Sequence, residues 1–408
     1  MAVKLVIIKQ SCPDAEYMHC SSHALNRSLI DSCTSRFIRN MFGIIKSVTT
    51  FFNDSAKRTH ALKHEIEYPD NDYLTLSKKK RLLSLCETRW VERNVALETF
   101  LELYVPILNT LDSLRIEGDS TSEQLYHPIN SFETIASSCI ACFLLSEITP
   151  VSRILQTPTI DFAIAHQQIL SLLNTFEARE TNAADYFKNV VFEQAKQISE
   201  ELFVQPAIPR TYQRRHGCQP DPEEFYRDQV FRPFLHELKA NIENRLSIFS
   251  QPCIQLLTQL RPEHITSTNC SIMELYKNFI EKFSDRLPQP FQLFGELERW
   301  KNECVNLMNK PNYVNMWMND LLDKCDLVLY PNVRFLLVFL ATLPVTTSST
   351  ERAFSSLKRI KTYCRSTMIE NRLNGLAAAF IHKNVDIDAM KILDLFVQKH
   401  PRRLNFGL

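Results

Sequence analysis

Glycine is scarce in this sequence. Only six of the 408 residues are glycine, and no two of them lie near each other along the chain. Loops that bind phosphate need clustered glycines, because a backbone without Cβ atoms lets phosphate oxygens approach the amide groups closely. The sequence therefore excludes nucleotide-binding enzymes of the P-loop, Rossmann and kinase types.

The sequence also lacks an excess of charge of either sign. Its 47 lysines and arginines against 46 aspartates and glutamates give a formal net charge of +1, which provides no global attraction to nucleic acid or to a membrane surface. No apolar stretch approaches the roughly 18 residues that a membrane span needs. The twelve cysteines are scattered, which is typical of a reducing compartment. We therefore expect a cytoplasmic or nuclear protein without disulfides.

Apolar residues at helical spacing are abundant. Asp221 can cap a helix that has Pro222 at its first position, and Pro233 is expected to kink that helix. Other stripes at helical spacing predict helices over 88–114, 132–145, 183–198, 272–283, 331–343, 349–364, 368–382 and 388–399. The best strand candidates are the short segments 16–20 and 343–346. The sequence thus predicts a mainly α fold with a small β component.

Three separated motifs follow one another along the chain. Residues 17–26 contain a Cys-x-x-His-x-Leu-Asn element, residues 85–90 contain Thr-Arg-Trp, and residues 343–355 contain Ser-x-x-Glu-Arg-x-Phe-Ser. The motif residues are Cys20, His23, Arg89, Trp90, Ser348, Glu351, Arg352, Phe354 and Ser355. Their order and wide spacing resemble the hAT superfamily of DNA transposases, and together they cover almost the whole chain.

The resemblance implies a ribonuclease-H-like domain that is split by a large helical insertion. Mapped onto this sequence, it implies a partial ribonuclease-H-like segment at 1–34, which contains the Cys-x-x-His element. A helical insertion domain at 35–325 and a C-terminal dimerisation region at 326–408 would follow. Because only 19 residues precede Cys20, the ribonuclease-H-like domain is expected to be incomplete.

DNA cleavage in this superfamily resembles two-metal phosphoryl chemistry, in which three carboxylates hold a pair of Mg²⁺ ions. The family's glutamate corresponds to Glu351, whereas its two aspartates belong before the Cys-x-x-His element, where Asp14 and Glu16 are the only acidic residues. Asp14 follows Pro13, which is typical of a turn. We therefore predict that no catalytic site is intact, that Glu351 is vestigial, and that the chain is not an enzyme. It would need no cofactor, since only an intact transposase would require Mg²⁺.

Residues 348–351 also have the pattern of a capping box, in which the Ser348 hydroxyl and the Glu351 carboxylate satisfy each other's backbone N–H groups at a helix start. We interpret Glu351 mainly as such a cap, with the catalytic role of an intact enzyme as the alternative. On the same helix, Phe354 and Ile360 are expected to face inward.

Cys20 and His23 are residue types that bind metals. Zinc normally takes four ligands in paired spacings, and the nearest other pair, His60 and His64, has no predicted reason to approach them. We therefore interpret Cys20 and His23 as packing residues and predict no metal site.

Two places are candidates for DNA contact. The family resemblance implies that Trp90 handles the cleaved DNA end, where an aromatic ring replaces the stacking partner of an extruded base, with Arg89 beside it; the alternative is a core aromatic. The loop 202–220 combines arginines with an aromatic residue, which suits contacts to the DNA backbone or simply solubility. Its candidates are Arg210, Tyr212, Arg214 and Arg215.

The predicted helix 368–382 has more apolar surface than one neighbour usually covers. The candidates for a subunit contact are Leu373, Leu376, Phe380 and Ile381. The family resemblance implies self-association of this region, so we expect a homodimer. The alternative is that these helices close the chain's own core.

These features lead to two main hypotheses. The first is a domesticated or truncated hAT transposase-like protein of the nucleus, which is catalytically inactive and acts through dimerisation and contacts with other nuclear proteins, non-specific DNA being a further candidate partner. The alternative is a fragment of an active DDE-type transposase that cleaves and transfers DNA strands with Mg²⁺ and whose N-terminus is missing. A third option is a decaying element without a role. No membrane and no small-molecule substrate are expected.

Overall fold

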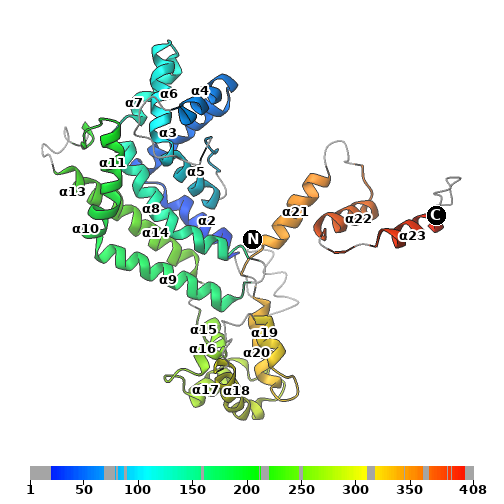
Figure 1. Ribbon diagram of the computed structural model, residues 1–408. Coiled ribbons are helices and arrows are strands. Elements are labelled where there is room, and N and C mark those ends of the chain that lie inside the picture. Colours follow the sequence, from blue (N-terminus) through cyan, green and yellow to red (C-terminus); the bar gives the residue numbers. More distant parts are fainter. Residues whose placement is uncertain are drawn as a thin grey trace. The chain divides into compact units, whose positions relative to one another are not determined.

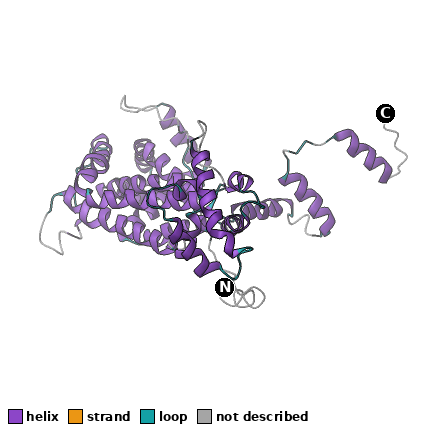
Figure 2. Cartoon of the chain, turned by 90° about the horizontal axis from the view of Figure 1, so that it is seen from below, coloured by secondary structure: helices purple, strands orange, loops and turns teal. Residues whose placement is uncertain are grey.

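Every regular element that the structure describes is a helix. The computed structural model describes residues 20–68, 79, 81–86, 90–157, 160–210, 212, 220–247, 251–309, 318–343, 345–361, 367–383, 385–386 and 388–399. Within these residues the mainly α fold is confirmed (Figure 2). The predicted β component is not, because the described residues form no strand. The chain divides into two compact units, Met1–Thr346 and Thr347–Leu408, which we call unit 1 and unit 2 (Figure 1).

The first part of unit 1 begins many of its helices at short polar side chains. Oxygens of Ser55, Asp119, Ser131, Asp161 and Asp221 each accept a hydrogen bond from a backbone N–H of the turn that follows, which satisfies a donor that has no partner within the helix. The helices are α2 (Ser21–Ser32), α3 (Arg36–Asn53), α4 (Ala56–Glu67), α5 (Trp90–Glu102), α6 (Tyr104–Ile116), α7 (Ser120–Ile129), α8 (Phe132–Ile154), α9 (Phe162–Thr181), α10 (Ala183–Tyr186), the π-helical η1 (Phe187–Phe192), α11 (Glu193–Glu201), α13 (Pro222–Tyr226), the π-helical η2 (Arg227–Phe231) and α14 (Arg232–Arg245). The predicted cap at Asp221 is confirmed.

The second part of unit 1 consists of shorter helices. They are α15 (Pro252–Thr258), α16 (Pro262–Ile265), α17 (Ile272–Phe283), the 3₁₀ turn η4 (Pro290–Gln292), α18 (Leu293–Met308), α19 (Met318–Lys324) and α20 (Pro331–Thr342). Proline stands in the first turn of α15, α16 and α20, where its missing N–H costs no helical hydrogen bond. The helices predicted over 272–283 and 331–343 are thereby confirmed.

Among its described residues, unit 2 contains three helices, α21 (Ser348–Ile360), α22 (Glu370–Ile381) and α23 (Ala389–Lys399). Helices α21 and α22 pack against each other. All three match the predicted segments to within a few residues, except that α21 ends at Ile360, before the predicted end near residue 364. The helical spacing of the apolar residues therefore locates the elements of unit 2 correctly.

Prolines explain two departures from the predicted helices. The segment predicted as one helix over 88–114 forms α5 and α6, because Pro106 is tolerated only in a first turn and a new helix therefore starts at Tyr104. The helix that starts at Pro222 stays helical, but its turn before Pro233 widens into η2. A π-turn there accommodates the hydrogen bond that the proline cannot donate.

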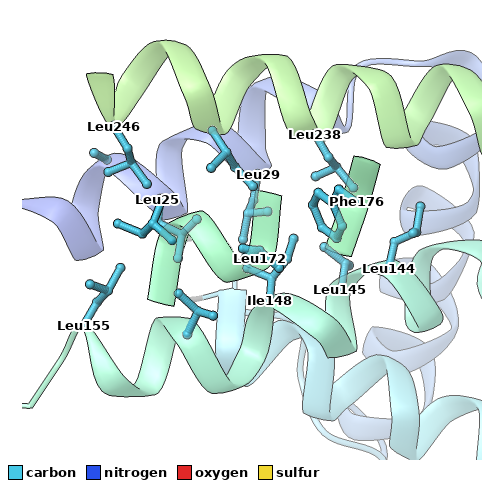
Figure 3. Packing of buried hydrophobic residues seen from close by; sticks show 14 of the residues in the cluster. Leu25, Leu29, Leu144, Leu145, Ile148, Leu155, Leu172, Phe176, Leu238 and Leu246 are labelled. Carbon is cyan, nitrogen blue, oxygen red and sulfur yellow. The ribbon is translucent and has the colours of Figure 1, made fainter. Parts of the chain in front are cut away.

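The core of unit 1 is built around α8. Ile148 on α8 lies beside Leu172 on α9, and Leu145 on α8 and Leu238 on α14 lie on either side of Phe176 of α9 (Figure 3), while α14 packs on α2. By length and composition alone, α8 is apolar enough to cross a membrane, but 72% of its most apolar window is buried inside the unit. The expectation that no stretch approaches this apolar length is therefore wrong for α8, which serves as a core helix.

Candidate functional site

The first and the last sequence motif meet in unit 1. The backbone N–H of Ser21 donates to the Val345 carbonyl at 2.9 Å, and the Cys20 Sγ lies 3.9 Å from the Thr346 Oγ1. Residues 16–19 and 344 of the two predicted strands lie outside the described part, and the described residues of both segments form no strand. The contact joins the start of α2 to the segment after α20 and so brings the two ends of unit 1 together.

The Cys-x-x-His-x-Leu-Asn element packs into the core through its leucine. Leu25, its leucine, is completely buried, whereas His23 is exposed and Cys20 is half-buried. The Ser28 hydroxyl donates to the Asn241 carbonyl at 2.9 Å, which fastens α2 to α14. No group of three or more His, Cys, Asp or Glu residues suited to a metal occurs among the residues that the structure describes. Because His23 is exposed, the packing interpretation is not supported for it, and for the half-buried Cys20 it stays a prediction.

The Thr-Arg-Trp element leads directly into α5, which begins at Trp90. Arg89 and the side chain of Trp90 lie outside the described residues, so their DNA-contact role stays a prediction. One turn later, the Arg93 guanidinium stacks over the Phe42 ring at 4.0 Å from its centroid. Helix α5 itself packs on the core helix α8. The motif therefore lies at the start of a helix that is packed against the core.

The candidate basic loop is described only in part. Arg210 is exposed, whereas Tyr212 is half-buried with its ring 4.7 Å from the ring of Phe225 in an edge-on arrangement. Arg214 and Arg215 lie outside the described residues. The ring of Tyr212 thus packs on Phe225, and contact of this loop with the DNA backbone stays a prediction.

The Glu351 carboxylate lies at the start of α21 but does not form the predicted capping box. The helix begins one residue earlier than expected, with Thr347 at the N-cap, so Ser348 already has helical geometry and cannot act as the cap. The Thr347 hydroxyl donates to the Glu351 Oε1 at 3.0 Å. Glu351 and Ser355 are exposed, and the side chains of Ser348 and Arg352 lie outside the described part.

Helices α21 and α22 pack through their small and aliphatic residues and leave larger ones exposed. Ile360 and Ala377 are buried, but Phe354 is 66% exposed, so the expectation that Phe354 faces inward is wrong. On α22, Leu373 is half-buried, and Leu376, Phe380 and Ile381 are 39%, 48% and 44% exposed. The predicted subunit-contact residues therefore form an apolar surface that α21 does not cover.

Residues 296–385 match the model of the hAT family C-terminal dimerisation region. This chain carries a hAT dimerisation region. It is also 24% identical over 400 residues to the 52 kDa repressor of the inhibitor of the protein kinase from Homo sapiens, covering 95% of this chain and 51% of that protein. The Mus musculus protein of the same name is 24% identical over 402 residues, or 95% of this chain and 52% of its own length. The chain thus spans about half the length of the curated relatives it matches.

The hAT dimerisation region overlaps the segment predicted at 326–408, but it begins inside α18 and ends before α23. Its first residue, Glu296, is completely buried and holds α18 against the start of α20. The Glu296 carboxylate accepts hydrogen bonds from the backbone N–H groups of Asn332 at 2.8 Å and Val333 at 3.1 Å, and from the Asn332 side-chain amide at 2.6 Å. A buried carboxylate at a helix N-terminus is favourable, because its charge meets unpaired donors and the positive end of the helix dipole.

No sequence pattern indicated the role of Glu296. It lies at helical spacing among charged neighbours on α18, which is typical of a solvated face. Its partner, Asn332, follows Pro331 at the start of α20, and the two residues are 36 positions apart. Only the packing of α18 on α20 brings them together.

A groove of about 780 Å³ lies outside the dimerisation region, between α9 and the α15–α16 segment. Burial lowers the pKa of His166 and of His264 in its wall. The neighbouring His264 lowers the pKa of His166 further, whereas Glu263 opposes the shift of His264 and Arg261 adds to it. The Arg261 guanidinium is held by Asp161 at 2.8 Å. Amide and hydroxyl side chains make up most of the remaining polar wall.

Proposed function

We propose that this chain is a transposase-derived protein that acts by self-association and by contacts with other nuclear proteins, without cleaving DNA. The observation on which the proposal rests is the match of residues 296–385 to a dimerisation region whose helix α22 exposes Leu376, Phe380 and Ile381. Exposed apolar side chains that cluster on one helix are typical of an interaction surface.

The names of the two relatives favour a regulatory role over an enzymatic one. Both are named as repressors of an inhibitor of a protein kinase, which is a regulatory name and not that of a DNA-cutting enzyme. A regulatory protein of this kind would retain the transposase scaffold and its self-recognition. We therefore place this chain among interaction proteins of the nucleus, with its protein partners unassigned.

The surroundings of Glu351 support the absence of catalysis. Two-metal cleavage needs several carboxylates converging within a few ångströms, whereas the Glu351 carboxylate is exposed and accepts a hydrogen bond from Thr347. Incubation of a labelled DNA duplex with the purified chain and Mg²⁺ should leave the duplex intact. Magnesium-dependent cutting that disappears in a Glu351→Gln variant would instead favour the fragment of an active transposase.

Self-association is tested by size-exclusion chromatography with light scattering. We expect a mass of twice the 47.5 kDa of one chain and a shift toward one chain in Phe380→Asp, because a carboxylate cannot be buried in an apolar interface without a partner. Phe291→Asp is the matched control, since Phe291 is fully exposed in unit 1 and precedes the matched region. A wild-type chain that elutes as a monomer at all concentrations would contradict the proposal. Adding hairpin-ended DNA to the same column tests nucleic-acid binding.

A further inference from the structure

Two rows of polar side chains line the groove between α9 and the α15–α16 segment. On α9, Gln167, Ser171 and Asn174 follow one another at spacings of four and three, and Gln255 and Gln259 follow at a spacing of four on the opposite wall. Residues at such spacings lie on one face of a helix. Gln259 is half-buried and the other four are exposed, so a ligand from solution has access to both rows.

The amide groups of these rows are available for binding. In the same wall, the Thr258 hydroxyl donates to the Gln255 carbonyl of its own helix at 2.7 Å. By contrast, the side-chain amides of the four rows' members listed next make no hydrogen bond within the described part of the chain: Gln167, Asn174, Gln255 and Gln259. An amide side chain offers both a donor and an acceptor. Each therefore suits a ligand group that also offers both.

The charged side chains of the groove already have partners within the protein. Arg261 binds Glu263 at 3.3 Å. Arg179 binds Glu147 at 3.1 Å. Burial lowers the pKa of the two histidines in the wall, so both are neutral near pH 7 and each carries one donor and one acceptor nitrogen. The groove therefore does not select its ligand by charge, which disfavours the phosphates of a nucleic acid.

Two buried contacts fasten the walls of the groove to each other and to the core. Asp161 accepts a hydrogen bond from the Ile164 backbone N–H at the start of α9 and binds Arg261 at the start of α16, at 2.9 and 2.8 Å. The Trp300 indole N–H donates to the Leu260 carbonyl at 2.8 Å. A groove that is formed before binding loses little conformational entropy when a ligand enters.

The spacing of the amides indicates the kind of ligand. Residues four apart on a helix are about 6 Å apart along its axis, and residues two apart on an extended chain are separated by about 6.7 Å. Successive amides of a row can thus meet equivalent N–H and C=O groups of an extended backbone. The groove face of α9 runs from Ala163 to Ala178, or about 20 Å, which an extended segment of about six residues would span.

We propose that this groove binds a short extended segment of another protein, by hydrogen bonds from its four amides to the main chain of that segment. Ile164 and Leu170 line the same wall and provide apolar contacts for the side chains of the segment. The volume of about 780 Å³ is within the usual range of ligand sites. The inference rests on the proposed contacts with other proteins and gives them a location in unit 1, but it does not depend on self-association.

Selection of phage-displayed random hexapeptides against the full chain tests the proposal. The best selected peptide is synthesised with blocked ends, and fluorescence polarisation measures its dissociation constant. Gln167→Ala/Asn174→Ala should raise this constant about tenfold or more, because it removes two hydrogen bonds. The matched control is Asn189→Ala/Gln197→Ala, which removes two exposed amides outside the groove, on η1 and α11, and should leave the constant unchanged.

Modified peptides test whether the main chain is recognised. Two peptides of the selected sequence are N-methylated at alternate positions, one in each register, which blocks main-chain donors and retains every side chain. At least one should bind about tenfold more weakly or worse. Equal binding of both would overturn the proposal, as would a selection that enriches no peptide or a selected peptide that binds the groove variant as well as wild type.

Light scattering of the same variants separates this inference from the proposed self-association. We expect Gln167→Ala/Asn174→Ala to have the same mass as wild type, because the groove lies outside unit 2. A monomeric wild type that still binds the peptide through the groove would overturn self-association alone. A dimeric wild type without peptide binding would overturn the inference alone.

Discussion

The two units place similar apolar side chains in opposite surroundings. Phe279 and Trp300 of unit 1 are completely buried, whereas Phe354 and Phe380 of unit 2 are exposed by about half or more. All four lie on helices with apolar residues at regular spacing. Helical spacing therefore identifies which face of a helix is apolar, but it does not say whether the same chain or another copy covers that face.

The same substitution, phenylalanine to alanine, made once in each unit tests this comparison most strongly. Phe279→Ala should lower the free energy of unfolding of unit 1 by about 4 kcal/mol, because it leaves a cavity in a closed core. Phe380→Ala should leave that value nearly unchanged and weaken self-association. Urea unfolding followed by tryptophan fluorescence measures the first effect and light scattering the second. Equal destabilisation by both variants would mean that the chain buries Phe380 in its own core.

A buried ion pair tests how firmly unit 1 is held together. Asp161 caps α9 and binds Arg261 at 2.8 Å, and both side chains are almost completely buried. Asp161→Ala should cost about 3 kcal/mol, since it removes the 2.8 Å partner of a buried guanidinium, whose contact to Glu263 is longer at 3.3 Å.

The matched control for this position is Asp161→Asn. It retains a capping oxygen and loses only the charge, so its cost in urea unfolding should be clearly smaller than that of Asp161→Ala. A loss below about 1 kcal/mol for Asp161→Ala would show that the pair does not join α9 to α16 energetically.

The smallest expected effect concerns the helix caps of the two units. Asp119 accepts hydrogen bonds from the backbone N–H groups of Ser122 and Thr121 and from Arg58, whereas Thr347 makes no side-chain cap of this kind. Asp119→Ala should therefore cost about 1 kcal/mol, and Thr347→Ala less. Thermal unfolding followed by circular dichroism compares the two variants, and a larger effect at Thr347 would contradict this ranking.

The Asp119 cap should also depend on pH. The Ser122 backbone N–H, followed by the Arg58 side chain, lowers the pKa of Asp119 in the folded chain. A lowered pKa stabilises the fold at pH values above the unfolded pKa of about 4, and this contribution disappears as the pH falls through the folded value. The difference in stability between wild type and Asp119→Ala should therefore shrink under acidic conditions, and a constant difference would exclude this linkage.

Local sequence patterns predicted most of the helices and the identity of the C-terminal region. The segment 272–283 has a serine cap and a continuous apolar stripe, so both its ends follow from its own residues. The start of α21 was misplaced by one residue, because Thr347 and Ser348 are both residue types that cap helices. The π-turn η1 has no local pattern that distinguishes it from ordinary helix, whereas η2 directly precedes Pro233.

Contacts between residues far apart in the sequence could not be predicted from the sequence. The Asp161–Arg261 pair spans 100 residues, and the meeting of Ser21 with Val345 closes almost the whole of unit 1. Neither contact has a motif, because each depends on how whole helices pack. Among the candidate site residues, the apolar surface on α22 could be predicted from spacing, whereas the buried role of Glu296 could not.

Sedimentation equilibrium of the full chain, with wild type beside a Leu376→Ser/Phe380→Ser variant, tests most directly whether unit 2 exists to pair two copies. We predict that wild type approaches twice the mass of one chain as its concentration rises and that the variant stays near the mass of one chain while unit 1 remains folded. Identical masses for the two proteins at every concentration would contradict the account.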